Sequence, residues 1–106
     1  MGTSVKHLES AAARVYAWFG ILPTKGVHVT REGQLAKVRA EALEFVEEPS
    51  LDEAADVFIT LIGALAQFGW SVTDLAVAVD TKMAINEKRT WAKMADGSYQ
   101  HNNEET

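Results

Sequence analysis

The chain has 106 residues, 47% of them hydrophobic, which fits one domain (1–106) with a single core. Its net charge of −5 argues against binding nucleic acid through the phosphate backbone, and the absence of cysteine excludes disulfides and thiolate metal sites and fits a cytoplasmic location. No apolar run approaches the ~20 residues that span a bilayer, and the N-terminal segment lacks the apolar core of a signal peptide. We therefore expect no membrane partner and no nucleic-acid partner.

The first helix is predicted from about residue 6 to residue 19. Apolar residues recur there at three- and four-residue steps, and the segment is rich in alanine. Gly20 is expected to end it, and residues 21–29 form a connection with one proline and one glycine as breakers. We expect residues 1–5 to be frayed.

Two capped helices follow. Thr30 is the expected N-cap of a helix that runs to about Glu47, where Pro49 forces the chain out of the α region. Ser50 opens the next helix with the pattern Ser-x-x-Glu of a capping box, and this helix continues to about Phe68.

The third helix is almost free of charge. Between Asp56 and Asp74 the sequence has no charged residue, so apolar groups lie almost all the way round the helix. A domain of this size would struggle to cover such a helix alone, and we therefore predict a homo-oligomer, a homodimer or a homotetramer, with this helix near the interface. One narrow polar stripe remains on it, formed by Glu53, Asp56, Thr60, Gly63 and Gln67.

A fourth helix is predicted from its N-cap at Ser71 to about Met94, and a polar tail over residues 95–106 follows. The four helices indicate an all-α, four-helix bundle-like protomer with a core of about residues 6–94.

Two pairs of carboxylates flank the break between the second and third helices. Glu41 with Glu44, and Glu53 with Asp56, are three residues apart, so each pair shares one helical face. A helical hairpin would bring the pairs together, and a hard cation such as Mg²⁺, or Mn²⁺ in its place, would remove their mutual repulsion. The sequence therefore predicts a divalent-metal site shared by two helices.

Ordinary roles compete with this interpretation. Acidic pairs at this spacing are common on solvated helices, Glu53 is also the capping-box residue, and Asp56 also suits the first turn of a helix. Lys37 lies one turn before Glu41, where it would orient that carboxylate, contact a phosphate or form a surface ion pair.

A second group of residues suits phosphate. Lys82, Asn86 and Arg89 follow one another at four- and three-residue steps and share a face of the predicted fourth helix. The alternative is a solvated face with local ion pairs. Trp91 would stack on a base or, alternatively, anchor the helix end.

Together these residues resemble the MazG-type all-α nucleoside triphosphate pyrophosphohydrolases, which are related to the dimeric dUTP pyrophosphatases. The matching pattern is Glu41-x-x-Glu44, Glu53-x-x-Asp56 and Lys82-x-x-x-Asn86-x-x-Arg89-x-Trp91. It covers about half of the chain. Many members of the family have a second glutamate where this sequence has Ala40, which puts an extra metal contact in doubt.

The resemblance implies Mg²⁺-dependent hydrolysis of a (deoxy)nucleoside triphosphate to the monophosphate and pyrophosphate, in house-cleaning or nucleotide-pool control. It implies four metal ligands, Glu41, Glu44, Glu53 and Asp56. It also implies substrate contacts from Lys82, Asn86 and Arg89, in active sites formed between subunits. Glu41 or Glu44 would take the proton of the attacking water. The competing function is a non-enzymatic helical oligomer, such as a regulatory or adaptor subunit.

Overall fold

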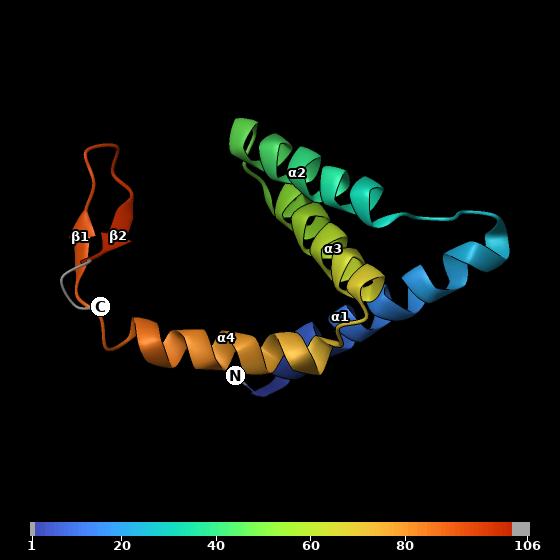
Figure 1. The fold of residues 1–106 in the computed structure, drawn as a ribbon, viewed down its shortest axis with the longest axis horizontal. Coiled ribbons are helices and arrows are strands. Elements are labelled where there is room, and N and C mark those ends of the chain that lie inside the picture. The colour runs from blue at the N-terminus through green and yellow to red at the C-terminus, as the bar shows by residue number, and fades with distance from the viewer. Residues whose placement is uncertain (1, 103–106) are drawn as a thin grey trace. The chain divides into compact units, whose positions relative to one another are not determined.

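The computed structural model describes the backbone of residues 2–102 and the side chains of residues 6–102. The elements in chain order are α1 (Gly2–Ile21), the 3-10 helix η1 (Leu22–Lys25), α2 (Arg31–Glu47), α3 (Leu51–Phe68), α4 (Val72–Asn86), β1 (Trp91–Lys93) and β2 (Tyr99–His101) (Figure 1). The chain divides into two compact units, with the boundary after Val72, and each unit is described by itself. The predicted all-α class is confirmed, with a small hairpin as an addition.

The predicted caps of α2 and α3 are confirmed. The Thr30 hydroxyl accepts a hydrogen bond from the Gly33 N–H (3.0 Å), and the Ser50 hydroxyl accepts one from the Glu53 N–H (3.1 Å). α3 ends where Gly69 adopts a left-handed conformation (φ 75°), as a glycine after a helix commonly does. The sequence therefore determines both ends of α3 and the start of α2 through local hydrogen bonds.

α2 and α3 form a helical hairpin in the first unit, and α1 packs on α3 (Figure 1). The middle of the polar stripe predicted on α3 faces this interior, since Thr60 and Gly63 are buried, whereas Asp56 is exposed. The fully or nearly buried apolar residues are Ala12, Leu22, Ile62, Ala64 and Leu65. Phe19 of α1 and Gln34 of α2 both approach Gly63 closely, so the three helices meet at this glycine.

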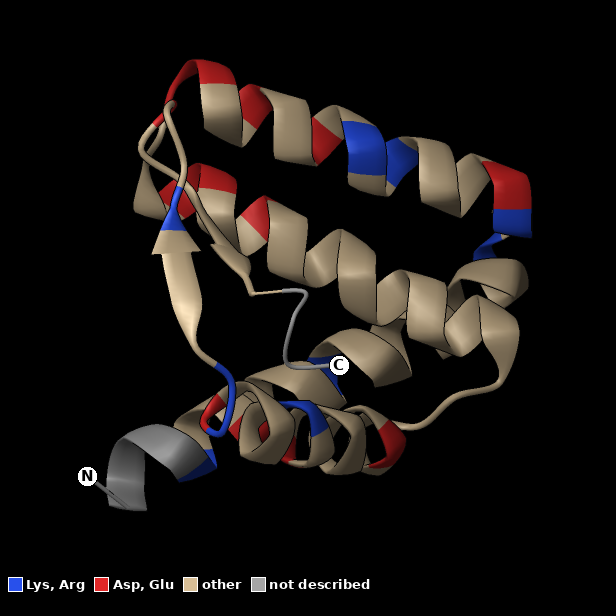
Figure 2. Ribbon diagram, turned by 60° about the vertical axis from the view of Figure 1, so that its left-hand side comes forward, with Lys and Arg blue, Asp and Glu red and all other residues tan. Residues whose placement is uncertain are grey.

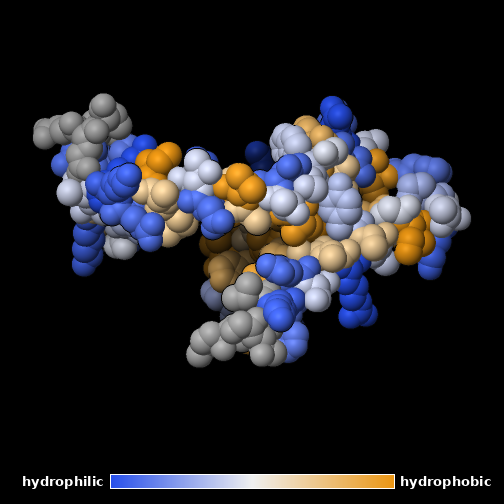
Figure 3. Space-filling view, turned by 90° about the horizontal axis from the view of Figure 1, so that it is seen from below, coloured by the Kyte–Doolittle hydropathy of each residue, from blue (hydrophilic) through white to orange (hydrophobic). Residues whose placement is uncertain are grey.

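Many large apolar side chains of this unit remain exposed. Leu35, Phe45 and Val46 of α2 are 50%, 38% and 70% exposed, and Leu51 at the start of α3 is 89% exposed. Figure 3 shows hydrophobic atoms reaching the surface on one face of the molecule. Among the described helices, none alone is long and apolar enough to cross a membrane, although α3 and α4 taken as a bent pair reach that length and composition.

Two predicted boundaries are wrong. α1 begins at Gly2, so the backbone of residues 2–5 is helical rather than frayed, while residue 1 lies outside the described part. α4 ends at Asn86 rather than near Met94. The N–H groups of Lys88 and Arg89 bond back only three residues, which tightens the chain out of the α-helix.

The segment after α4 forms an antiparallel hairpin in place of a helix end and a tail. β1 pairs with β2, Trp91 opposite His101. Gly97 has a φ of 88°, and Asp96 accepts hydrogen bonds from the N–H and the hydroxyl of Ser98. An Asp-Gly turn between aromatic residues is a hairpin signal, and it takes precedence over the helical periodicity that extended the predicted helix. Residues 103–106 of the predicted tail lie outside the described part.

Candidate metal centre and the hollows beside it

Three carboxylates meet between α2 and α3. One oxygen from each of Glu41, Glu53 and Asp56 lies within 4.8 Å of the others. Glu41 comes from α2 and is 7% exposed, whereas Glu53 and Asp56 come from the first turns of α3. In Figure 2 acidic segments gather on α2 and α3 near the turn that joins them. The helical hairpin therefore brings together one member of the first predicted pair and both members of the second.

Lys37 and Glu44 flank this cluster on α2. The Lys37 ammonium lies 2.9 Å from Glu41 Oε1, and this contact raises the pKa of Lys37 and lowers that of Glu41. The pKa of Glu44 is raised, first by its hydrogen-bonding contact with Glu41 and then by the negative charges of Glu41 and Glu53. Glu44 thus adjoins the cluster.

Two oxygens of the cluster are buried without a hydrogen-bond partner, Oε2 of Glu41 and Oε2 of Glu53. Buried carboxylate oxygens normally have a donor or a cation beside them, because an unsatisfied charge is costly. Three carboxylates without histidine or cysteine form the donor set that Mg²⁺ and Mn²⁺ prefer. The residues present therefore fit a hard divalent cation.

Of the two roles that competed for the Glu53 carboxylate in the sequence, the structure places it with the acidic cluster, while the cap at Ser50 uses only the Glu53 backbone. Its backbone N–H binds the Ser50 hydroxyl, and its carboxylate lies with Glu41 and Asp56. The cap thus fixes the helix start and leaves the side chain for the cluster.

A cavity of about 310 Å³ adjoins the cluster. It is lined by Trp18, Phe19, Leu22, Gln34, Lys37, Glu41, Asp56, Ile59 and Thr60. Gln34 in this lining was not predicted as a site residue. The available signal was the position of Gln34, one turn before Lys37 and two turns before Glu41 on the same face of the helix.

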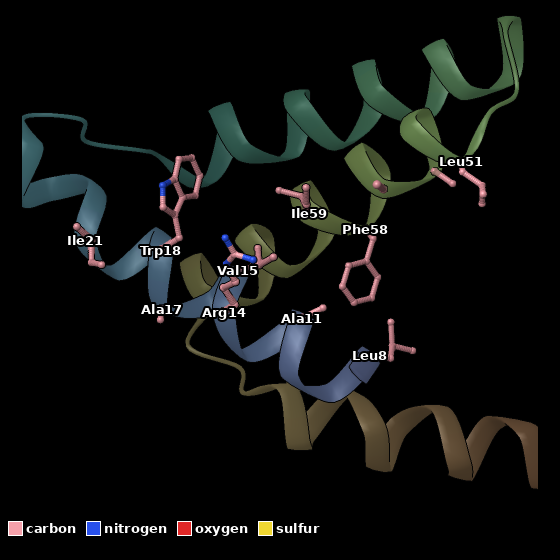
Figure 4. Close-up of a pocket in the computed structure, with 12 residues that line it drawn as sticks. Leu8, Ala11, Arg14, Val15, Ala17, Trp18, Ile21, Leu51, Phe58 and Ile59 are labelled. Carbon is pink, nitrogen blue, oxygen red and sulfur yellow. The ribbon is translucent and has the colours of Figure 1, made fainter. Parts of the chain in front are cut away.

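A second, larger hollow of about 970 Å³ lies between α1 and α3. Apart from Arg14 its lining is apolar: Leu8, Ala11, Val15, Ala17, Trp18, Ile21, Leu51, Ala54, Ala55, Phe58 and Ile59 (Figure 4). In the close-up, Phe58 of α3 points toward α1 near Leu8. We call this hollow the apolar groove and the first the carboxylate cavity.

The predicted phosphate group lies in the second unit. Lys82 and Asn86 belong to α4, but Arg89 lies beyond its end, so the prediction that all three share one helical face is wrong for Arg89. Trp91 begins β1, where its indole N–H donates to the Asn86 carbonyl (3.0 Å) and its ring contacts Tyr99. The contribution of these residues to a substrate site stays a prediction.

Comparison with known proteins gives concordant matches. The model of a family described as dATP/dGTP pyrophosphohydrolase matches residues 5–105. A dATP/dGTP diphosphohydrolase of Salmonella phage PMBT28 is 41% identical over 69 residues, which are 63% of this chain but only 23% of the phage protein. A solved structure, a MazG-like pyrophosphohydrolase of cyanophage S-2L bound to dGDP and three catalytic Mn²⁺ ions per active site, matches with a TM-score of 0.68 and 28% identity, over 90% of this chain and 91% of that one.

Proposed function

Because this chain belongs to the dATP/dGTP pyrophosphohydrolase family, we propose that it hydrolyses dATP and dGTP to the monophosphate and pyrophosphate. The reaction would require Mg²⁺, with Mn²⁺ as a substitute, and would serve house-cleaning or nucleotide-pool control. The S-2L relative, with its bound dGDP and Mn²⁺ ions, supports both the substrate class and the kind of metal.

The observation that carries the proposal is the carboxylate cluster with its two unpartnered buried oxygens. Solvated acidic side chains, the ordinary alternative, would expose these oxygens to water. Glu41, Glu53 and Asp56 would hold the cation, and Glu44 would join from the next turn of α2.

The cation, when bound, supplies Lewis-acid activation of water and neutralises phosphate charge. The chain's own residues then have separate tasks. Lys37 positions Glu41 through their ion pair and offers a positive charge at the cavity wall. Glu41 or Glu44 takes the proton of the attacking water. Lys82, Asn86 and Arg89 are proposed to contact the phosphates of the substrate.

The proposed active form is a homodimer or a homotetramer. The charge-free part of α3 and the exposed apolar groove between α1 and α3 support this assembly, because hollows of this size and composition mark association surfaces. A second copy of the chain is the proposed occupant.

A nucleotide panel tests the function. The protein is incubated with dATP, dGTP, dCTP and dTTP with Mg²⁺ and with chelator, and pyrophosphate is assayed. We expect metal-dependent release from dATP and dGTP. If no pyrophosphate is released from any of the four nucleotides, the proposal is contradicted, and a non-enzymatic helical oligomer is favoured.

A further inference from the structure

Lys37 carries the single positive charge among the described residues that line the carboxylate cavity. Its ammonium lies 2.9 Å from Glu41 Oε1. The contact with Glu41 and, to a smaller extent, the negative charges of Glu44 and Asp56 raise the pKa of this ammonium. One ammonium offsets the charge of a single carboxylate, so most of the negative charge of the cluster remains for another cation.

Helix stability does not explain this ion pair. A pair of this kind favours a helix more when the glutamate precedes the lysine, whereas here Lys37 precedes Glu41. Ion pairs between two exposed side chains also contribute little to stability. This pair differs because the side chain of Glu41 is only 10% exposed and its other oxygen, Oε2, is buried without a hydrogen-bond partner. The ammonium therefore serves a carboxylate that is largely out of water, and it satisfies only one of the two oxygens.

The two partners differ in their freedom to move. The side chain of Lys37 is 61% exposed, whereas Glu41 lies inside the helical hairpin of α2 and α3. A long side chain with most of its surface in water can turn its ammonium into solvent, and it regains rotamer freedom when it does so. Lys37 can therefore leave the pair while the carboxylate of Glu41 stays in place.

A divalent cation would compete with this ammonium. The three oxygens that could hold the ion lie within 4.8 Å of one another, and one of them belongs to Glu41. An ion held there and an ammonium on the same carboxylate would repel each other, and the repulsion is stronger where water is partly excluded. The ion and the lysine therefore cannot both satisfy Glu41 without a loss of free energy.

We propose that Lys37 is an exchangeable counter-cation, which neutralises Glu41 in the metal-free protein and gives up this carboxylate when a divalent cation binds. This inference rests on the metal centre of the proposed function. While the ion is absent, the lysine supplies the counter-charge that a buried carboxylate needs. When the ion binds, the lysine must be displaced, which lowers the affinity for the ion and frees a positive charge at the cavity wall.

The test measures the affinity for Mn²⁺ alone, without nucleotide, by titration calorimetry. Lys37→Met keeps an unbranched apolar side chain with a similar helix propensity but removes the charge. Because the competitor is gone, we expect this variant to bind Mn²⁺ about tenfold more tightly, a usual size for the coupling between two binding events. In the presence of chelator it should melt at a lower temperature than the wild type, because Glu41 then lacks its counter-charge.

Two further variants separate the ion pair from other effects of the substitution. Arg39→Met removes the same charge from an exposed position of α2 outside the cavity, and it should bind Mn²⁺ as the wild type does. Lys37→Arg keeps the positive charge at the cavity, and it should stay close to the wild type both in Mn²⁺ affinity and in the melting temperature with chelator.

Equal or weaker Mn²⁺ binding by Lys37→Met would overturn the inference, because a lysine that only orients Glu41 would aid the ion rather than oppose it. Equally tight binding by Lys37→Met and Arg39→Met would also overturn it, since the gain would then come from net charge. The inference fails alone if the wild type binds Mn²⁺ and releases pyrophosphate but Lys37→Met binds no more tightly. The proposed function fails alone if Lys37→Met binds more tightly but the wild type releases no pyrophosphate. Absence of Mn²⁺ binding in every variant would overturn both.

Discussion

The three-helix unit has two hollows that share Trp18 and Ile59 but differ in chemistry. The carboxylate cavity is small and contains Lys37, Glu41 and Asp56, whereas the apolar groove is about three times larger and, among the described residues, has Arg14 as its single charged lining residue. Charges that are partly buried need a counter-charge, while exposed apolar surface needs only to be covered. The same helix α3 thus borders the proposed ligand site on one side and the proposed association surface on the other.

The largest effect on activity is expected at the carboxylate cavity. Asp56→Asn keeps the size of the side chain but weakens it as a metal ligand, so pyrophosphate release should fall more than ~100-fold. Asp52→Asn, four residues earlier on α3 and outside the cluster, should retain activity. Equal activity of the two variants in a pyrophosphate assay would contradict the assignment of the cavity.

Gly63→Ala tests the close packing behind the carboxylate cavity. The added methyl group would collide with Phe19 and Gln34, so the free energy of unfolding should fall by ~1–3 kcal/mol in a urea titration. Gly20→Ala is the matched control, because nothing lies within 4 Å of its Cβ position. It should stabilise α1 by up to ~1 kcal/mol. Indistinguishable unfolding midpoints would show that α3 tolerates a side chain here.

Ala11→Glu tests the apolar groove. A carboxylate in this surface should weaken self-association about tenfold, as measured by sedimentation, because it would be desolvated against the second copy. Ala13→Glu, on the exposed part of the same helix outside the groove, should self-associate as the wild type does. Unchanged association of Ala11→Glu would show that the groove is not the interface.

The smallest effect is expected at Ser50, which caps the helix that borders both hollows. Ser50→Ala removes the bond to the Glu53 N–H and should lower the free energy of unfolding by ~1 kcal/mol. Ser10→Ala, in the middle of α1, should not lower the free energy of unfolding in the same thermal unfolding measurement and should raise it slightly, because alanine is the better helix former. If Ser10→Ala lowers the free energy of unfolding as much as Ser50→Ala does, the stabilising role of the Ser50 cap is contradicted.

The sequence predicted the elements whose signals are local. Thr30 and Ser50 determine helix starts through hydrogen bonds to neighbouring residues, and these predictions are confirmed, as is the end of α3 at Phe68. The family resemblance carried by the acidic and basic motifs is confirmed by the match over residues 5–105. The hairpin after α4 was missed because apolar residues at helical spacing outweighed the Asp-Gly turn signal.

Contacts between distant segments could not be read from spacing. The carboxylate cavity depends on Gln34 reaching Thr60 and on Gly63 admitting Phe19, partners that are 26 and 44 residues apart. Helical periodicity shows which residues share a face but not which face meets which neighbour. Arg89 shows the same limit. Its predicted place on a shared helical face requires the helix to include it, but α4 ends three residues earlier.

The melting temperature with and without divalent cations tests the carboxylate cavity most directly, since an ion that binds only the native state must raise it. We predict that Mg²⁺ and Mn²⁺ raise the melting temperature of the wild type and of Asp52→Asn, and that this rise is lost in Asp56→Asn and Glu53→Gln. An equal rise in all four proteins, or no rise in the wild type, would contradict a metal centre formed by Glu41, Glu53 and Asp56.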